Sequence, residues 1–176
     1  GNPIGVAVNV SPRQFRDPGF TDAVMRALDA SGLSPKLLEL EITESMLMED
    51  MDTAITTMKE LNQLGIHLAI DDFGTGYSSL AYLKNFPIRR LKIDKSFVQG
   101  LTPDTEDSPI ISAIINLAHN MDLAVIAEGI ENEAQREYLR QLGCDEGQGY
   151  LLARPMPAAD MDKLLLEDRP QVKQYR

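Results

Sequence analysis

The chain has 176 residues and a formal net charge of −10, which argues against binding to nucleic-acid polymers because lysine and arginine must neutralise their phosphates. Its length suffices for one well-cored domain, and no apolar run approaches the roughly 20 residues of a membrane helix, so no membrane insertion is expected in this segment. The single cysteine, Cys144, excludes an internal disulfide and fits a reducing cytoplasm. We expect it to be a buried apolar side chain rather than a nucleophile.

Short strand-like runs alternate along the chain with longer amphipathic stretches. Strands are predicted, in chain order, over residues 6–10, 37–43, 67–73, 90–96, 123–129 and 146–152. Helices are predicted over residues 19–31, 50–64, 78–85, 107–120, 131–142 and 158–166. Gly32, Gly65 and Gly143 each follow a predicted helix, a position typical of left-handed caps. This succession predicts parallel strands joined by right-handed crossovers.

Two architectures contain such a succession, an open doubly wound sheet and a (βα)8 barrel. No glycine-rich nucleotide fingerprint follows the first strand, which weakens the open-sheet alternative. Barrel active sites are built at the C-terminal ends of strands, and polar residues lie near four such ends, namely Glu41, Asp71, Asp72, Lys92 and Glu128. A barrel typically takes about 250 residues and eight units. We therefore expect a (βα)8 TIM-type barrel, truncated at its N-terminus and present with about six βα units.

The segment "IHLAIDDFGTGYSSL" (66–80) places two adjacent aspartates at the end of an apolar run. Consecutive strand residues point to opposite faces, so Asp71 and Asp72 can share a target only where the strand breaks up. Gly74 and Gly76 permit such a break. The pair could then bind one or two divalent cations, whose charge removes the repulsion. A turn cap is the structural alternative, since aspartate is common before glycine in tight turns.

The remaining polar candidates also have structural alternatives. Asn9 offers a neutral oxygen ligand or forms an Asx turn. Of Glu41 and Glu44, one is expected to ligate a metal and the other to hold a loop in place; surface salt bridges are the structural alternative for both. Lys92 faces the expected lumen, where an unpaired ammonium is costly, so it acts beside the carboxylates or forms an internal ion pair.

Two further motifs and two histidines complete the set of candidates. Glu128 and Glu131 frame "EGIE", and Gln148 lies between two glycines in "GQGY". His67 lies four residues before Asp71, too deep in its strand to reach the mouth, and His119 comes late in a predicted helix. We do not expect either histidine to be a metal ligand.

Six segments together span nearly the whole chain: "VNVSPRQF", "LELEITES", "AIDDFGTGYSSLAYL", "LKIDKSFV", "IAEGIE" and "GCDEGQGYLLARPMP". With them the sequence resembles the EAL family of cyclic di-GMP phosphodiesterases. The resemblance implies a (βα)8 barrel whose mouth binds two Mg²⁺ or Mn²⁺ ions. It also implies hydrolysis of cyclic di-GMP to linear pGpG in bacterial second-messenger signalling.

The resemblance assigns roles to individual residues of this sequence. Metal ligands are implied at Asn9, Glu41, Asp71, Asp72 and Glu128, with Asp72 on the second metal. Catalytic roles are implied for Lys92, which matches a lysine beside the attacking water, and for Glu131 and Gln148. Glu44 matches the glutamate that anchors the "DFGTGYSS" loop. Substrate contacts are implied for Ser11, Gly74, Thr75, Gly76, Tyr77, Arg154 and Pro155.

The resemblance further implies a partial EAL domain over residues 1–167 and a C-terminal tail over 168–176. The Glu-Ala-Leu strand, with one metal-ligating glutamate, is expected upstream of Gly1, so activity of this chain alone stays open. The expected partners are cyclic di-GMP, a second copy in a homodimer, and a sensor or diguanylate-cyclase-like domain on the N-terminal side. The expected location is the cytoplasm, in a parent protein that can be tethered to the inner membrane.

Two other functions stay open at this point. A catalytically inactive cyclic di-GMP-binding module would usually lose several acidic ligands, and the visible ones are all retained here. An unrelated barrel enzyme could use Lys92 to form a Schiff base, although that chemistry does not call for so many acids.

An incomplete barrel also leaves unpaired strand edges near residues 6–10 and 146–152, and such edges can pair with another chain.

Overall fold

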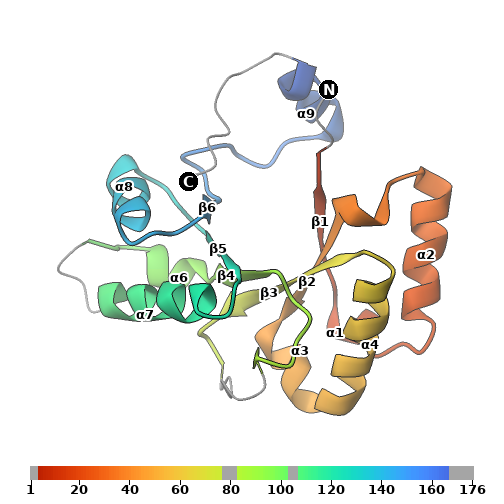
Figure 1. The fold of residues 1–176 in the computed structure, drawn as a ribbon. Helices are drawn as coiled ribbons and strands as arrows, with labels where there is room; N and C mark the ends of the chain where they lie inside the picture. The colour runs from red at the N-terminus through yellow and green to blue at the C-terminus, as the bar shows by residue number, and fades with distance from the viewer. Residues whose placement is uncertain (1–3, 77–82, 103–106, 167–176) are drawn as a thin grey trace.

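A curved parallel sheet of six strands forms the centre of the computed structural model, which describes residues 4–76, 83–102 and 107–166 (Figure 1). The strands are β1 (Val6–Asn9), β2 (Leu38–Thr43), β3 (His67–Phe73), β4 (Arg90–Ile93), β5 (Ala124–Ala127) and β6 (Glu146–Gly147). They pair in chain order without a reversal, and all pairs are parallel. This is the topology of a TIM-type (βα)8 barrel present in part, as predicted, and it differs from the open doubly wound alternative.

Helices follow the strands, and most of them lie against the outer face of the sheet (Figure 1). They are α1 (Pro12–Phe15), α2 (Phe20–Ser31), the 3₁₀ helix η1 (Pro35–Leu37), α3 (Glu44–Glu49), α4 (Met51–Gln63), α6 (Lys95–Val98), α7 (Asp107–His119), α8 (Glu133–Gln141) and α9 (Ala158–Leu166). In Figure 1, α2, α3 and α4 lie on the side of β1 to β3, and α6, α7 and α8 on the side of β4 to β6. Among the described residues, none of these helices combines the length and the apolar character needed to cross a membrane.

Five predicted helices are confirmed to within two residues at each end, whereas the prediction for 78–85 lies mostly outside the described residues. Two strand predictions are too long. β4 ends at Ile93 because Asp94 caps α6, its Oδ1 accepting the Ser96 N–H at 2.9 Å. β6 has only two residues, since the chain turns directly after Gly147.

The two faces of β2 and β4 differ in chemical character rather than in burial. Leu40 and Ile42 of β2 and Leu91 and Ile93 of β4 are buried in the apolar core. Each such side chain contributes roughly 1.5–3 kcal/mol by leaving water. The alternate positions carry charged side chains, of which Glu39, Glu41 and Lys92 are also buried, so the lumen of the curved sheet is polar.

Left-handed caps return the chain from several helices to the sheet. Gly32, Gly65 and Gly143 have φ angles of 69°, 89° and 86°, a region that glycine enters without a steric penalty. The predicted caps are therefore confirmed. They place each following strand in line with its neighbours, which brings the C-terminal ends of the strands together.

The sheet does not close among the described residues, and β1 and β6 are its edges. All four residues of β1 are exposed, including Val6 at 46% and Val8 at 43%. The open edges expected near residues 6–10 and 146–152 are therefore present in the described part of the chain.

Candidate active site

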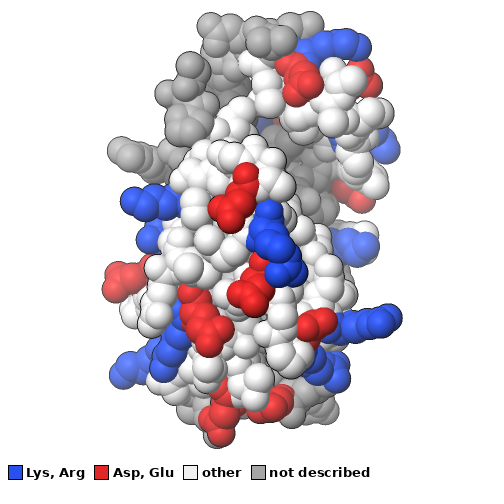
Figure 2. Space-filling view, turned by 90° about the vertical axis from the view of Figure 1, so that its right-hand side faces the viewer, with Lys and Arg blue, Asp and Glu red and all other residues white. Residues whose placement is uncertain are grey.

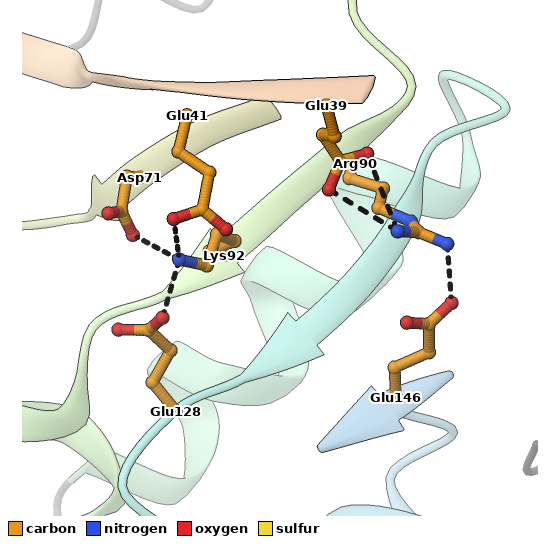
Figure 3. Close-up of polar contacts among 7 residues, drawn as sticks. All are labelled: Glu39, Glu41, Asp71, Arg90, Lys92, Glu128 and Glu146. Carbon is orange, nitrogen blue, oxygen red and sulfur yellow. Dashed lines mark hydrogen bonds and ion pairs between the residues drawn. The ribbon is translucent and has the colours of Figure 1, made fainter. Parts of the chain in front are cut away.

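Lys92 lies at the centre of a cluster of carboxylates that come from β2, β3 and the chain directly after β5 (Figure 3). Its Nζ is 2.8 Å from Glu41 Oε2 on β2, 3.1 Å from Asp71 Oδ1 on β3 and 2.6 Å from Glu128 Oε1 directly after β5. Only 3% of the Lys92 side chain is exposed. Parallel strands end at one edge of the sheet, and this geometry brings residues 87 positions apart in the sequence onto one ammonium group.

The charge state of Lys92 follows from these contacts. Burial alone would lower the pKa of Lys92, but hydrogen bonds to Glu128 and Glu41 outweigh burial and raise it. The amine is therefore a permanent ammonium at neutral pH. A Schiff-base lysine must be neutral to attack a carbonyl, so this environment disfavours the Schiff-base alternative.

Glu128 shares the single positive charge of Lys92 with two other acids. Burial raises the pKa of Glu128, and the negative charges of Asp71 and Glu41 raise it further, against the hydrogen bond from Lys92. One ammonium therefore does not compensate the surrounding carboxylates. The excess of negative charge is what a bound cation would relieve.

The two adjacent aspartates reach the same side because β3 breaks at Asp72. Asp72 has φ 54°, in the left-handed region, and the β3–β4 register shifts between Ile70 and Phe73. The break thus comes at Asp72 itself, earlier than the expected position at Gly74 and Gly76. Its backbone N–H donates to Asp71 Oδ1 at 3.0 Å, which fixes the two carboxyl groups relative to each other.

Carboxylate oxygens of Asp71, Asp72 and Glu128 all lie within 4.8 Å of one another. Such an all-oxygen set suits a hard divalent cation such as Mg²⁺, Mn²⁺ or Ca²⁺. Burial raises the pKa of Asp72, and the charge of Asp71 raises it further, since the aspartates repel each other without a cation between them. The donor chemistry therefore fits a divalent metal.

Asp94 extends the cluster, although it is not among the expected site residues. It follows Lys92 by two residues on the lumen side and shares a hydrogen bond with Asp72. Burial opposes ionisation of Asp94, but hydrogen bonds from Ser96 outweigh burial and lower its pKa. The i, i+2 spacing to Lys92 was the signal that could have identified it.

Asn9 and Glu44 flank the cluster from β1 and α3. In the orientation that satisfies its amide, Asn9 donates to Asp71 Oδ2 at 3.1 Å and to Glu41 Oε2 at 3.3 Å. Glu44 is buried, and its Oε2 accepts the Gly74 N–H at 3.0 Å. Its Oε1 has no hydrogen-bond partner among the described residues, and a side chain at position 76 would collide with it. Only glycine at 76 lets the loop approach Glu44 this closely.

The other candidates lie outside the carboxylate cluster. The Glu131 N–H donates to Gln135 at the start of α8, and the exposed Gln148 donates its own N–H to the Ala127 carbonyl. Ser11 caps α1, and the Thr75 hydroxyl donates to the Asp72 carbonyl at 2.8 Å.

The two C-terminal candidates also lie outside the cluster. Arg154 stacks on the Tyr150 ring at 4.6 Å, and Pro155 is exposed. Tyr77 lies outside the described residues.

Neither histidine belongs to the carboxylate cluster, and Cys144 is buried as predicted. His119 Nε2 is 2.9 Å from Asp145 Oδ2, and burial together with Arg89 and Arg90 lowers the pKa of His67. Burial raises the pKa of Cys144 to about 12, which leaves it a protonated thiol in the core.

The face of the molecule over α2 and α4 carries acidic and basic side chains interspersed with uncharged ones (Figure 2). This face shows no continuous basic surface among the described residues.

Comparison with known proteins identifies the family to which this barrel with its strand-end acids belongs. The EAL domain family matches residues 1–155, and the chain belongs to this family. It is 47% identical over 156 residues to the bifunctional diguanylate cyclase/cyclic di-GMP phosphodiesterase MucR of Pseudomonas aeruginosa. That match covers 89% of the chain but only 23% of MucR.

Solved structures give the same result. The PaMucR phosphodiesterase in complex with c-di-GMP superposes with a TM-score of 0.86 at 47% identity, covering 89% of this chain and 64% of that one. The EAL domain of Mycobacterium smegmatis DcpA gives 0.89 at 42% identity, covering 96% and 75%. A manganese and cyclic di-GMP complex of Klebsiella pneumoniae BlrP1 gives 0.79 at 30% identity, covering 86% and 39%.

Proposed function

We propose that this chain carries the hydrolytic site of a cyclic di-GMP phosphodiesterase, which uses Mg²⁺ or Mn²⁺ and yields linear pGpG. The observation that carries the proposal is the convergence of Asp71, Asp72 and Glu128 beside a buried, charged Lys92. The similarity to proteins solved with c-di-GMP, one of them with manganese, supports the choice of substrate and cofactor.

Asp71, Asp72 and Glu128 would hold the divalent cations, with Glu41 and Asn9 completing the ligand set. The bound cations would supply Lewis-acid activation and neutralise phosphate charge. In the reaction, water adds to phosphorus, the P–O3′ bond breaks, and the 3′ oxygen leaves as a hydroxyl after taking the proton that the water loses.

Lys92 would stabilise the negative charge that develops on the phosphoryl oxygens, since its ammonium is fixed by three ion pairs before substrate arrives. Gln148 and Glu131 would position the attacking water at the rim of the cluster. Glu44 would hold the loop through the Gly74 N–H. Ser11, Gly74, Thr75, Gly76, Tyr77, Arg154 and Pro155 would contact the substrate.

The test is direct. The purified chain is incubated with cyclic di-GMP and Mn²⁺ or Mg²⁺, and products are separated by chromatography. Formation of pGpG that stops on chelation is the expected result. Tight binding of cyclic di-GMP without pGpG would instead identify a binding module and contradict hydrolysis by this chain.

We also propose that the domain extends over residues 1–167, with 168–176 as a tail, in a cytoplasmic protein with a sensor or diguanylate-cyclase-like domain on its N-terminal side. Two copies of the domain would form a homodimer. Light scattering that shows a stable, dilute monomer would contradict the homodimer.

A further inference from the structure

A second charged group lies in the lumen next to the Lys92 cluster, closer to the N-terminal ends of the strands (Figure 3). Arg90, the first residue of β4, directs Nη1 to Glu39 of β2, with Oε1 at 3.3 Å and Oε2 at 3.4 Å. Its Nη2 contacts Glu146 Oε1 of β6 at 2.9 Å. We call Glu39, Arg90 and Glu146 the Arg90 brace. One guanidinium thereby links the second strand of the sheet to the sixth.

The brace depends on the curvature of the sheet. Strands two apart in a flat sheet are separated by about 10 Å, so the span from β2 to β6 would be roughly 19 Å. The carboxylates of Glu39 and Glu146 nevertheless reach one planar guanidinium. A planar fork with donors on two sides can satisfy both acids at once, whereas a lysine ammonium is a single point. The brace therefore holds β2 and β6 at the separation of a curled sheet.

Each member of the brace precedes a candidate site residue by two positions in the same strand or its direct continuation. Glu39 precedes Glu41, Arg90 precedes Lys92, and Glu146 precedes Gln148. Residues two apart in a strand share a face and lie about 6.5 Å apart along it. The distance between β2 and β6 at the brace therefore also sets the distance between Glu41 and Gln148, which lie one step further along the same strands.

β6 is the strand that most needs such a tether. It pairs with β5 through only two residue positions, Ile126 with Glu146 and Ala127 with Gly147. The chain then continues into Gln148, whose N–H donates to the Ala127 carbonyl at 2.8 Å. An edge strand with so little backbone pairing opens easily unless side chains hold it.

We propose that Arg90 is a positioning residue, which holds the strand that carries Gln148 at a fixed distance from Glu41 and Lys92. The inference rests on the proposed function for its kinetic consequence. Its structural consequence, a tethered β6, is independent of whether the chain hydrolyses cyclic di-GMP.

The main test compares Arg90→Met with Arg89→Met. Arg89 is adjacent and exposed, and its loss removes the same charge beside His67, so it is a matched control. Hydrogen–deuterium exchange in Arg90→Met is expected to accelerate more than about tenfold over residues 146–151, with β2 and β3 little changed. For cyclic di-GMP cleavage with Mn²⁺, kcat is expected to fall on the order of tenfold while KM stays within about twofold. Arg89→Met is expected to leave exchange and kinetics within about twofold of the wild type.

Two further variants separate positioning from general stability. Arg90→Lys keeps the charge beside Glu39 but cannot contact both acids. Its thermal midpoint should therefore be close to that of the wild type, whereas its exchange over β6 and its kcat should resemble those of Arg90→Met. Glu146→Met removes only the β6 side of the brace, because it has no side-chain oxygen to accept from Arg90 Nη2, and it should reproduce the exchange and kinetic changes. Unchanged exchange over 146–151 in a folded Arg90→Met or a folded Glu146→Met would overturn the proposal. Full recovery of kcat by Arg90→Lys would do the same. If the wild type cleaves nothing, the exchange data alone decide.

Discussion

The two cationic side chains of β4 lie two residues apart on one face, yet their surroundings differ. Lys92 is 3% exposed and contacts three carboxylates, whereas Arg90 is 36% exposed and contacts two. Asp72 and Asp94 adjoin the Lys92 cluster and enlarge its negative charge. The Arg90 brace, in contrast, is a planar cation matched to two acids, one buried and one half-exposed.

The Lys92 cluster has an excess of negative charge, whereas the charges of the Arg90 brace are paired within the chain. Around Lys92, burial and mutual repulsion raise the pKa of Glu128 and of Asp72, so negative charge is left for a divalent cation to neutralise. Around Arg90, the donors and acceptors satisfy one another within the chain. Substitutions in the Lys92 cluster should therefore have effects that depend on divalent cations, and substitutions in the brace should not.

The largest effect is expected for Asp71→Asn. Asp71 contacts Lys92 and belongs to the convergent oxygen set, so its neutral isostere weakens any cation held there. Mn²⁺ affinity by calorimetry and cleavage of cyclic di-GMP should each fall by at least about 100-fold. Asp122→Asn is the control, since Asp122 is exposed and its φ of 58° suits asparagine. Equal cation affinity in both variants would remove the basis for a metal site.

The next largest effect is expected for Lys92→Met, with opposite signs for catalysis and cation binding. Cleavage should fall roughly 100-fold because the fixed ammonium is lost. Mn²⁺ affinity should stay equal or rise, since a competing cation has left Glu41, Asp71 and Glu128. Without metal the variant should lose roughly 3–5 kcal/mol of unfolding free energy, because buried acids lose their partner.

Thermal unfolding with and without Mn²⁺ checks this prediction. The metal should restore most of the stability lost in Lys92→Met, and it should stabilise the wild type less. Destabilisation that Mn²⁺ does not reverse would mean that Lys92 serves the core rather than a cation site.

A smaller effect is expected for Glu39→Gln in the Arg90 brace. The substitution keeps the volume of a buried side chain and removes one half-exposed ion pair, so unfolding free energy should fall by about 1 kcal/mol. Denaturant titrations should give the same loss with and without Mn²⁺. A loss that Mn²⁺ reverses would contradict the division between the two layers.

The comparison also shows how far sequence reasoning reaches. Period-two alternation and glycine caps predicted the parallel strands, and the positions of acids at strand ends predicted that Glu41, Asp71, Lys92 and Glu128 lie together. These features are local, or follow from parallel strands ending at one edge.

What the sequence did not reveal depends on contacts between strands. The break at Asp72 rather than at the glycines depends on the β3–β4 register, and the shared hydrogen bond places Asp94 in the cluster. The Arg90 brace depends on how far a side chain reaches across a curved sheet. The overlong strand prediction at 90–96 arose because the Asp94 cap, a local signal, was not weighed against an apolar alternation.

The smallest effect is expected for the pH dependence of stability, and it isolates the repulsion within the Lys92 cluster. The pKa of Asp72 is raised in the folded chain by burial and by Asp71. A raised carboxyl pKa favours the folded state at acid pH, and this contribution is lost as pH rises through the folded pKa. Metal-free wild type should therefore lose stability from acid to neutral pH relative to Asp72→Asn, which has no proton to lose.

The difference in thermal midpoint between the two proteins should be about 2–4 °C, and it should shrink when Mn²⁺ neutralises the aspartate pair. Because Asp72 already has a left-handed backbone conformation that asparagine tolerates, a change in backbone strain cannot imitate this result. Parallel pH profiles for the two proteins would mean that the aspartate pair is already relieved within the chain, and the contrast with the Arg90 brace would disappear.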